Sequence, residues 1–121
     1  MATIAPTVLP GADIKHQRVS WEGFAASGDV GTAVTVLGPY PDKTVQSVGT
    51  YAGSLSILWE GSLDGGVTWF GLTDVNNVSL AMTAVGGKAV AEAVPQIRPR
   101  ATAGAGAADV DCWLFASGVS L

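Results

Sequence analysis

The sequence predicts an all-β fold: a single-domain antiparallel β-sandwich of jelly-roll or Greek-key type, with about eight or nine short strands and an extended N-terminal arm. Two observations lead to this prediction. Segments rich in Val, Thr and aromatic residues recur about every 8–12 residues, separated by clusters of Gly, Asp, Asn and Pro that form turns. The length of 121 residues suits one domain with a core of its own.

The expected strands follow one another closely along the chain. They are residues 19–24, 32–37, 43–51, 54–62, 67–72, 77–83, 88–94, 95–102 and 109–117. Within 54–62 the side chains alternate, and Leu55, Ile57 and Trp59 share one face. Such alternation is typical of a strand that buries one face.

The last expected strand, 109–117, is apolar on both faces. Val110, Cys112 and Leu114 share one face, whereas Trp113 and Phe115 lie on the other. A strand of this kind is either central in a two-sided core or part of a subunit interface. We expect Trp113 and Phe115 to be partly buried against a neighbouring chain.

Residues 1–18 are expected to form an extended arm, and residues 19–121 the sandwich domain. Prolines and a glycine interrupt the first segment, which shows no periodicity. A terminal arm is ordered only when something holds it, which favours a packed assembly, and the alternative is that the fold itself holds it. The candidate contact residues of the arm are Ile4, Val8, Leu9 and Ile14.

The surface is expected to be unusually poor in charge. Asp, Glu, Lys and Arg make up 13% of the chain, about half the usual share, whereas hydrophobic residues make up 48%. Part of such a surface is expected to be covered by another protein. The net charge of -4 argues against a nucleic acid partner, because phosphate neutralisation needs clustered Lys and Arg.

Membrane insertion and signal-dependent secretion are not expected. No segment approaches the roughly 18 consecutive apolar residues that cross a bilayer. The N-terminus lacks the basic start and the continuous apolar run of a signal peptide. The chain is therefore expected to be made in the cytoplasm. Its single cysteine, Cys112, excludes an internal disulfide.

The stretch GSLDGGVTW is the best-defined turn of the sequence. Ser62, Asp64, Gly66, Thr68 and Trp69 match the pattern S-x-D-x-G-x-T-W, which resembles the Asp-box of sialidases and related β-propellers. In such a turn Ser and Asp hydrogen-bond the backbone, Gly permits a positive φ, and the aromatic ring packs beneath. One copy in a chain too short for a propeller indicates a structural hairpin rather than a glycan-processing site.

The sequence offers no catalytic set, and we expect the protein not to be an enzyme. The single histidine, His16, lies in the expected arm without partners on a rigid scaffold. Cys112 on an apolar strand face is expected to be a small core residue. Asp109 and Asp111 share a strand face but have no third ligand nearby, so no metal and no other cofactor is predicted.

Arg98 and Arg100 lie on a strand that leads through a Gly-rich loop into the last strand. If these two strands form a hairpin, one register pairs Arg100 with Asp109 and Arg98 with Asp111. Such a ladder would contribute about 0.2–1 kcal/mol per pair. The alternative is that both arginines dock on an acidic partner surface. The prolines of this strand place it at a sheet edge or beside a bulge.

The order of these segments resembles small structural proteins of tailed bacteriophages. The resemblance covers roughly residues 54–117 and rests on WEGSLDGGVTWFGLTD, then VPQIRPRATAGAGAADVD, then a hydrophobic last strand. It implies a virion component, in particular a capsid decoration (cement) protein that binds the outer head surface and stabilises the assembled capsid. Its partners would be the major capsid protein or other virion proteins, and it would be a homo-oligomer, with a trimer favoured.

Two other functions stay open from the residues. One is a head–tail, tail or fibre-associated virion protein, which would differ in copy number and symmetry. The other is a carbohydrate-binding β-sandwich module, suggested by Trp21, Trp59, Trp69 and Trp113. Sugar binding needs aromatic side chains exposed on one face. Trp59 and Trp69 occupy apolar-facing strand positions, so a glycan partner is less favoured.

Overall fold

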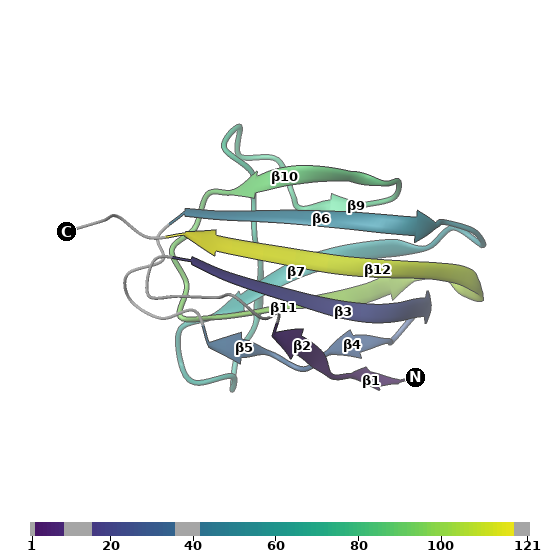
Figure 1. Cartoon of the computed structure of the whole chain (residues 1–121), viewed down its shortest axis with the longest axis horizontal. Helices are drawn as coiled ribbons and strands as arrows, with labels where there is room; N and C mark the ends of the chain where they lie inside the picture. The colour runs from purple at the N-terminus through teal and green to yellow at the C-terminus, as the bar shows by residue number, and fades with distance from the viewer. Residues whose placement is uncertain (1, 9–15, 36–41, 118–121) are drawn as a thin grey trace.

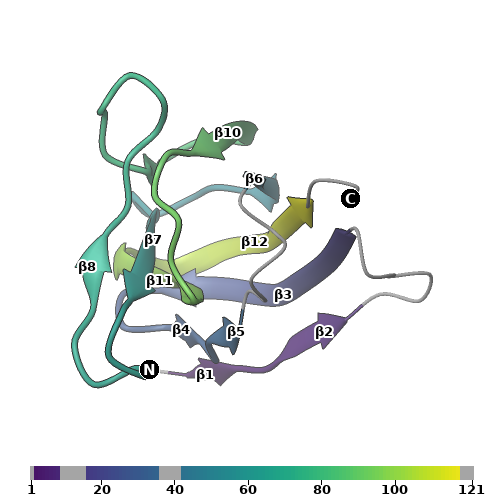
Figure 2. The ribbon, with the colours of Figure 1, turned by 90° about the vertical axis from the view of Figure 1, so that its left-hand side faces the viewer.

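The structure is a computed structural model, and it describes residues 2–8, 16–35 and 42–117. These residues form two β-sheets packed face to face, with no helix among them. Figure 1 shows one sheet in front of the other, and Figure 2 shows the two layers from one end. The prediction of an all-β, single-domain sandwich is therefore confirmed.

The five-stranded sheet is the front layer in Figure 1. Its strands run in the order β10-β6-β12-β3-β2, and every neighbouring pair is antiparallel. Their bounds are Pro6–Val8 (β2), His16–Ala26 (β3), Asp42–Thr50 (β6), Gly86–Val90 (β10) and Ala105–Ser117 (β12). The three longest strands, β3, β6 and β12, lie side by side at its centre.

The second sheet has seven strands, most of them short. Its order is β1-β4-β11-β7-β8, with β5 beside β11 and β9 beside β7, and only the β1–β4 pair is parallel. The bounds are Thr3–Ile4 (β1), Val30–Gly31 (β4), Val34–Thr35 (β5), Ser56–Ser62 (β7), Phe70–Gly71 (β8), Ala81–Met82 (β9) and Gln96–Ala103 (β11). The expected strands 67–72 and 77–83 shrink to β8 and β9, because the carboxylates of Asp64 and Asp74 hold the adjoining backbone in turns.

The core lies between the two sheets and is joined across the middle by two tryptophans. Trp21 of β3 and Trp59 of β7 are fully buried and meet edge to face, with ring centroids 5.7 Å apart. The Trp21 indole N–H donates to the Thr32 carbonyl at 2.9 Å. The alternation predicted for residues 54–62 is confirmed, since Ile57 and Trp59 are both fully buried.

The prediction of a separate arm over residues 1–18 is corrected for the part of that segment that the structure describes. β1 pairs with β4 in the second sheet, β2 pairs with β3 in the first, and β3 itself begins at His16. Asp29 anchors the start, because its carboxylate accepts a hydrogen bond from the Ala2 amide at 3.0 Å. β1 and β2 run along the lower edge of Figure 1, where their neighbouring strands satisfy backbone groups.

The four apolar arm residues expected to contact a neighbour have different positions. Ile4 is partly buried against the core of its own chain. Val8 lies in β2, opposite Val19 in the backbone register. Leu9 and Ile14 lie outside the described residues. Ile4 therefore packs against the core of its own domain.

The predicted hairpin between the arginine-bearing strand and the last strand is wrong, because β11 and β12 lie in different sheets. β11 pairs with β7, whereas β12 pairs with β3 and β6. The ladder from Arg98 and Arg100 to Asp109 and Asp111 therefore does not form. Facing sheets bury the apolar inner residues of both strands. Each buried Val or Leu is worth about 1.5–3 kcal/mol, more than an exposed ion pair at about 0.2–1 kcal/mol.

Pro99 lies on a central strand, so the first predicted alternative, an edge strand, is wrong. The second alternative holds, because the β11–β7 pairing is irregular between Ala101 and Ala103. β11 has β7 on one side, and on the other it pairs first with β5 and then with β4. The amide of Ala101 donates to the Asp29 carbonyl on that second side. The missing N–H of Pro99, two residues earlier, faces the same side. It falls at the break between β5 and β4, where the ladder is already interrupted.

Candidate protein-contact face

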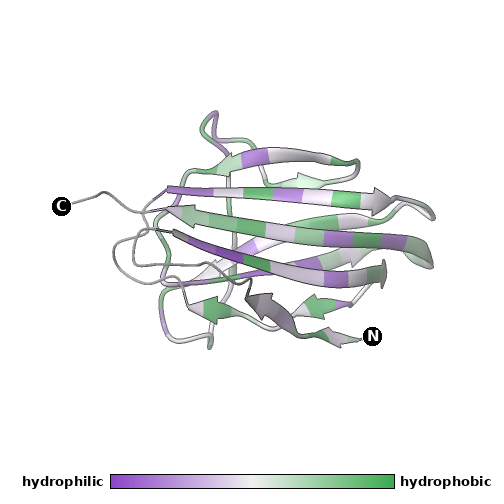
Figure 3. Cartoon of the chain, in the orientation of Figure 1, coloured by the Kyte–Doolittle hydropathy of each residue, from purple (hydrophilic) through white to green (hydrophobic). Residues whose placement is uncertain are grey.

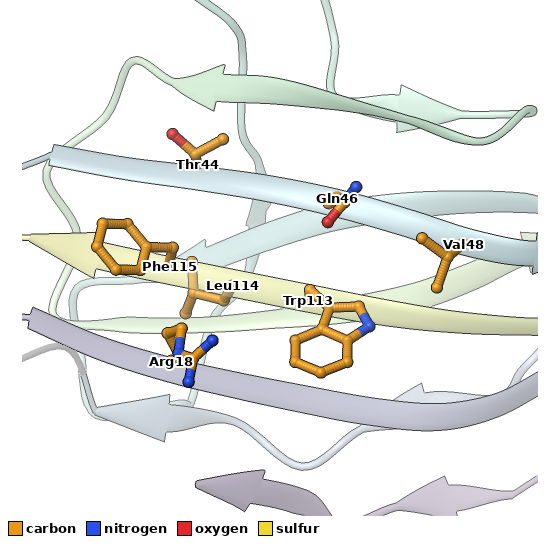
Figure 4. A pocket seen from close by; sticks show the side chains of 7 residues that line it. All are labelled: Arg18, Thr44, Gln46, Val48, Trp113, Leu114 and Phe115. Carbon is orange, nitrogen blue, oxygen red and sulfur yellow. The ribbon is translucent and has the colours of Figure 1, made fainter. Parts of the chain in front are cut away.

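The outer face of the five-stranded sheet carries a group of side chains around two aromatic rings. We call it the aromatic face and define it by Arg18, Thr44, Gln46, Val48, Trp113 and Phe115. Figure 4 shows these side chains projecting from β3, β6 and β12 on the same side of the sheet. They line a shallow hollow of about 440 Å³.

The strand register sets this arrangement. Trp113 of β12 lies between Gln46 on β6 and Ser20 on β3, and Phe115 lies in the next outward row. The alternate residues of β12, from Val110 to Ala116, point the other way and are buried in the core. The last strand is therefore apolar on both faces, as predicted, with one face in the core and the other on the surface.

The two aromatic side chains are only partly covered by their own chain. Phe115 is 41% exposed and Trp113 is half-buried. Aromatic area surrounded by polar groups is the composition found at the centre of protein–protein contacts. The sequence-based expectation that a neighbouring chain covers Trp113 and Phe115 stays a prediction.

Arg98 and Arg100 lie on the second sheet, where both donate to Glu60. Arg98 Nε lies 3.1 Å from Glu60 Oε1, and Arg100 Nη2 lies 3.0 Å from Glu60 Oε2. The Arg98 guanidinium also stacks on the Trp69 ring, 4.0 Å from its centroid. Glu60 therefore neutralises part of the charge of both arginines. Less positive charge is left for the alternative prediction, in which the two arginines dock on an acidic partner surface.

Glu60 is the member of this cluster that sequence reasoning did not single out. It is buried and lies directly opposite Arg98 in the β7–β11 register. Its position on the polar face of its strand was readable from the alternation. To predict the two ion pairs, the sequence would also have had to reveal that the strand of Glu60 lies beside the strand of Arg98 and Arg100.

The GSLDGGVTW turn is held by side-chain hydrogen bonds to its own backbone. Ser62 Oγ accepts from the Gly66 amide at 2.9 Å and donates to Asp64 Oδ1 at 2.8 Å. Asp64 Oδ1 also accepts from the Thr68 amide at 2.8 Å, and the Trp69 indole N–H donates to the Gly66 carbonyl at 3.1 Å. Gly66 has a φ of 90°, which favours glycine. All five residues therefore act on the turn that joins β7 to β8.

We expect this hairpin to make stability depend on pH in acid. Hydrogen bonds from the Thr68 amide and the Ser62 hydroxyl lower the pKa of Asp64 from 3.8 to about 2. The ionised carboxylate therefore stabilises the fold above pH 3.8, and this contribution disappears as the pH falls to about 2. The gap in unfolding midpoint between wild type and Asp64→Asn should be clear at neutral pH and should close in acid. A gap that stays constant would contradict this role.

Cys112 and His16, the two residues weighed for catalysis, lie in strands of the five-stranded sheet. Burial raises the pKa of the Cys112 thiol, and the nearby charge of Asp111 adds to the effect. Cys112 is thus a core residue. Within the described ranges, no group of three or more His, Cys, Asp or Glu side chains could hold a metal ion. That part of the chain also contains no helix able to span a membrane.

The four tryptophans do not form an exposed platform in the described part of the chain. Trp21 and Trp59 are fully buried in the core. Trp69 lies beneath the Arg98 guanidinium. Trp113 is the tryptophan of the aromatic face, so a sugar would find no row of tryptophan rings there.

No family model matches the sequence, and no curated protein matches it. A solved structure, that of the SPBc2 prophage-derived protein YomS, aligns with a TM-score of 0.59 at 14% identity, covering 87% of this chain and 96% of that chain. A protein of Bacillus endospore appendages, which form disulfide-linked pili, aligns with a lower TM-score of 0.38 at 14% identity, covering 97% of this chain and 91% of that chain. The chain therefore shares its fold with a prophage-derived protein.

Proposed function

We propose that this chain is a structural protein of a bacteriophage virion, in particular a decoration protein on the outer surface of the capsid. The observation that carries the proposal is the aromatic face around Trp113 and Phe115. Aromatic area left exposed on a regular sheet contributes little to its own fold, but it stabilises a contact with another subunit. The fold shared with the prophage-derived YomS supports the assignment to a phage particle.

The aromatic face is built on a strand that has a paired neighbour on each side. Trp113 and Phe115 both lie on the part of β12, residues 112–117, that is paired continuously with β3 on one side and β6 on the other. Side chains on a strand fixed from both sides lose little further freedom when they are covered, which favours binding.

Decoration would act through mass action. A protein that binds only the assembled shell adds its binding free energy to the stability of that shell. A contact centred on two aromatic side chains can be weak in each copy, because the symmetry of the head repeats it many times.

Quantitative mass spectrometry of purified particles tests the proposal. We expect on the order of hundreds of copies per head, because a decoration protein repeats with the symmetric lattice. The major capsid protein in the same sample provides the copy-number standard. A handful of copies would overturn decoration in favour of the head–tail junction, the tail or a fibre. Complete absence from particles would overturn the virion role.

A further inference from the structure

Two residues of opposite charge on β3 lie at equal spacing on either side of the position that faces Trp113 of β12. Trp113 lies opposite Ser20, and Arg18 and Glu22 stand two residues before and two residues after Ser20. Both charged side chains are exposed, and alternation along the strand places them on the same outward side. In Figure 3, β3 carries two hydrophilic bands, separated by a hydrophobic band and a paler stretch.

Asp111 of β12 adds a second carboxylate to the acidic end of this face. It lies at the register shift between Val110 and Cys112, where the amide of Gly23, the residue after Glu22, donates to its Oδ1 at 3.1 Å. In the row of Arg18, the neighbour on β12 is Phe115 instead. The basic and acidic ends are thus separated by about 13 Å along the strands, with Trp113 between them.

This layout is complementary to itself. Consider a second copy packed face to face on the first and related to it by a two-fold axis. The axis lies in the contact plane, crosses the strands and passes beside Trp113. β3 then lies over β3 with its direction reversed. Arg18 of each copy faces the acidic row of Glu22 of the other copy, and the two Trp113 side chains meet at the centre.

We propose that the aromatic face binds a second copy of this chain, as a two-fold dimer centred on Trp113 and flanked by two Arg18–Glu22 ion pairs. This inference rests on the proposed function of the face and names its partner. A partner of one charge sign would be attracted at one end of the face and repelled at the other, whereas a second copy satisfies both ends. Asp42 and Asp109 lie four positions along the strands from Trp113, at the rim, where salt screens their repulsion.

A charge exchange in the purified protein tests the dimer. Sedimentation equilibrium should show a dimer for the wild type. Arg18→Glu or Glu22→Arg alone brings like charges together twice and should raise the dimer dissociation constant about tenfold or more. The double variant with both changes restores opposite charges, so it should dimerise as the wild type does.

Lys88→Glu is the matched control, because it changes the net charge by the same amount as Arg18→Glu. Lys88 lies 3.9 Å from Asp74 and opposite the inward-facing Val45, away from the aromatic face. It should leave the dissociation constant unchanged. Thermal unfolding checks that each variant folds. A monomeric or trimeric wild type, or a double variant no better than the single ones, would overturn the two-fold contact.

The outcomes separate this inference from the proposed function. A protein that is monomeric in solution but abundant on particles would overturn the dimer and leave the virion role standing. A dimer that responds to the charge exchange but is absent from particles would overturn the virion role and leave the contact standing.

Discussion

Replacing Trp21 by alanine is expected to lower the free energy of unfolding by about 3–5 kcal/mol, a large fraction of the stability of a domain of this size. The Trp21 ring is fully buried and packs edge to face on Trp59 across the two sheets. Paired strands on both sides cannot collapse into the cavity that alanine would leave. The Thr32 carbonyl would also lose its indole donor. Chemical denaturation followed by far-UV circular dichroism measures the loss.

Trp113→Ala is the matched control on the opposite face of the same sheet. Trp113 is half-buried, so its removal leaves no enclosed cavity. In dilute solution it should lower the free energy of unfolding by less than about 1.5 kcal/mol. Equal losses at Trp21 and Trp113 would contradict the division between a core tryptophan and a surface one.

Gly49→Ala is expected to lower the free energy of unfolding by about 3–5 kcal/mol, from backbone strain and overpacking together. Gly49 of β6 has a φ of 113°, a conformation that L side chains rarely adopt. A Cβ at this position would also overlap the carbonyl oxygen of Asp109 on β12. Because the obstacle is backbone and not a flexible side chain, β6 and β12 would have to separate locally. The denaturation midpoint and slope measure the effect.

Gly23→Ala separates the two causes of that loss. Gly23 lies in β3 of the same sheet with a φ of 91°, but a Cβ there would meet nothing within 4 Å. Its substitution should therefore show the strain alone, about 1–3 kcal/mol. If Gly49→Ala lowered the free energy of unfolding no more than Gly23→Ala does, the overlap with Asp109 would not contribute to the loss.

Patterns within a few residues allowed several features to be predicted from the sequence. The burial of Ile57 and Trp59 follows from strict alternation along one strand. The turn is equally local, because Ser62 and Asp64 hydrogen-bond groups no more than four positions away. The two apolar faces of the last strand could likewise be read from consecutive residues.

Strand pairing could not be predicted in the same way. The ladder from Arg98 and Arg100 to the last strand matched in charge and in spacing, yet both cations pair with Glu60, which is 38 positions from Arg98. Here the two segments lie in opposite sheets, and the apolar inner residues of both are buried in the core between the sheets. The first residues were misassigned for a related reason, since their partners in β3 and β4 follow later in the chain.

By itself the sequence determined the all-β class, the structural hairpin at GSLDGGVTW and the presence of apolar residues on both faces of the last strand. Only the tertiary structure decided which strands are neighbours, that β1 and β2 belong to opposite sheets, and that Trp113 stands midway between Arg18 and Glu22. Alternation and turn chemistry act over a few residues. Pairing and register instead depend on which apolar faces can be buried together, which is a property of the whole chain.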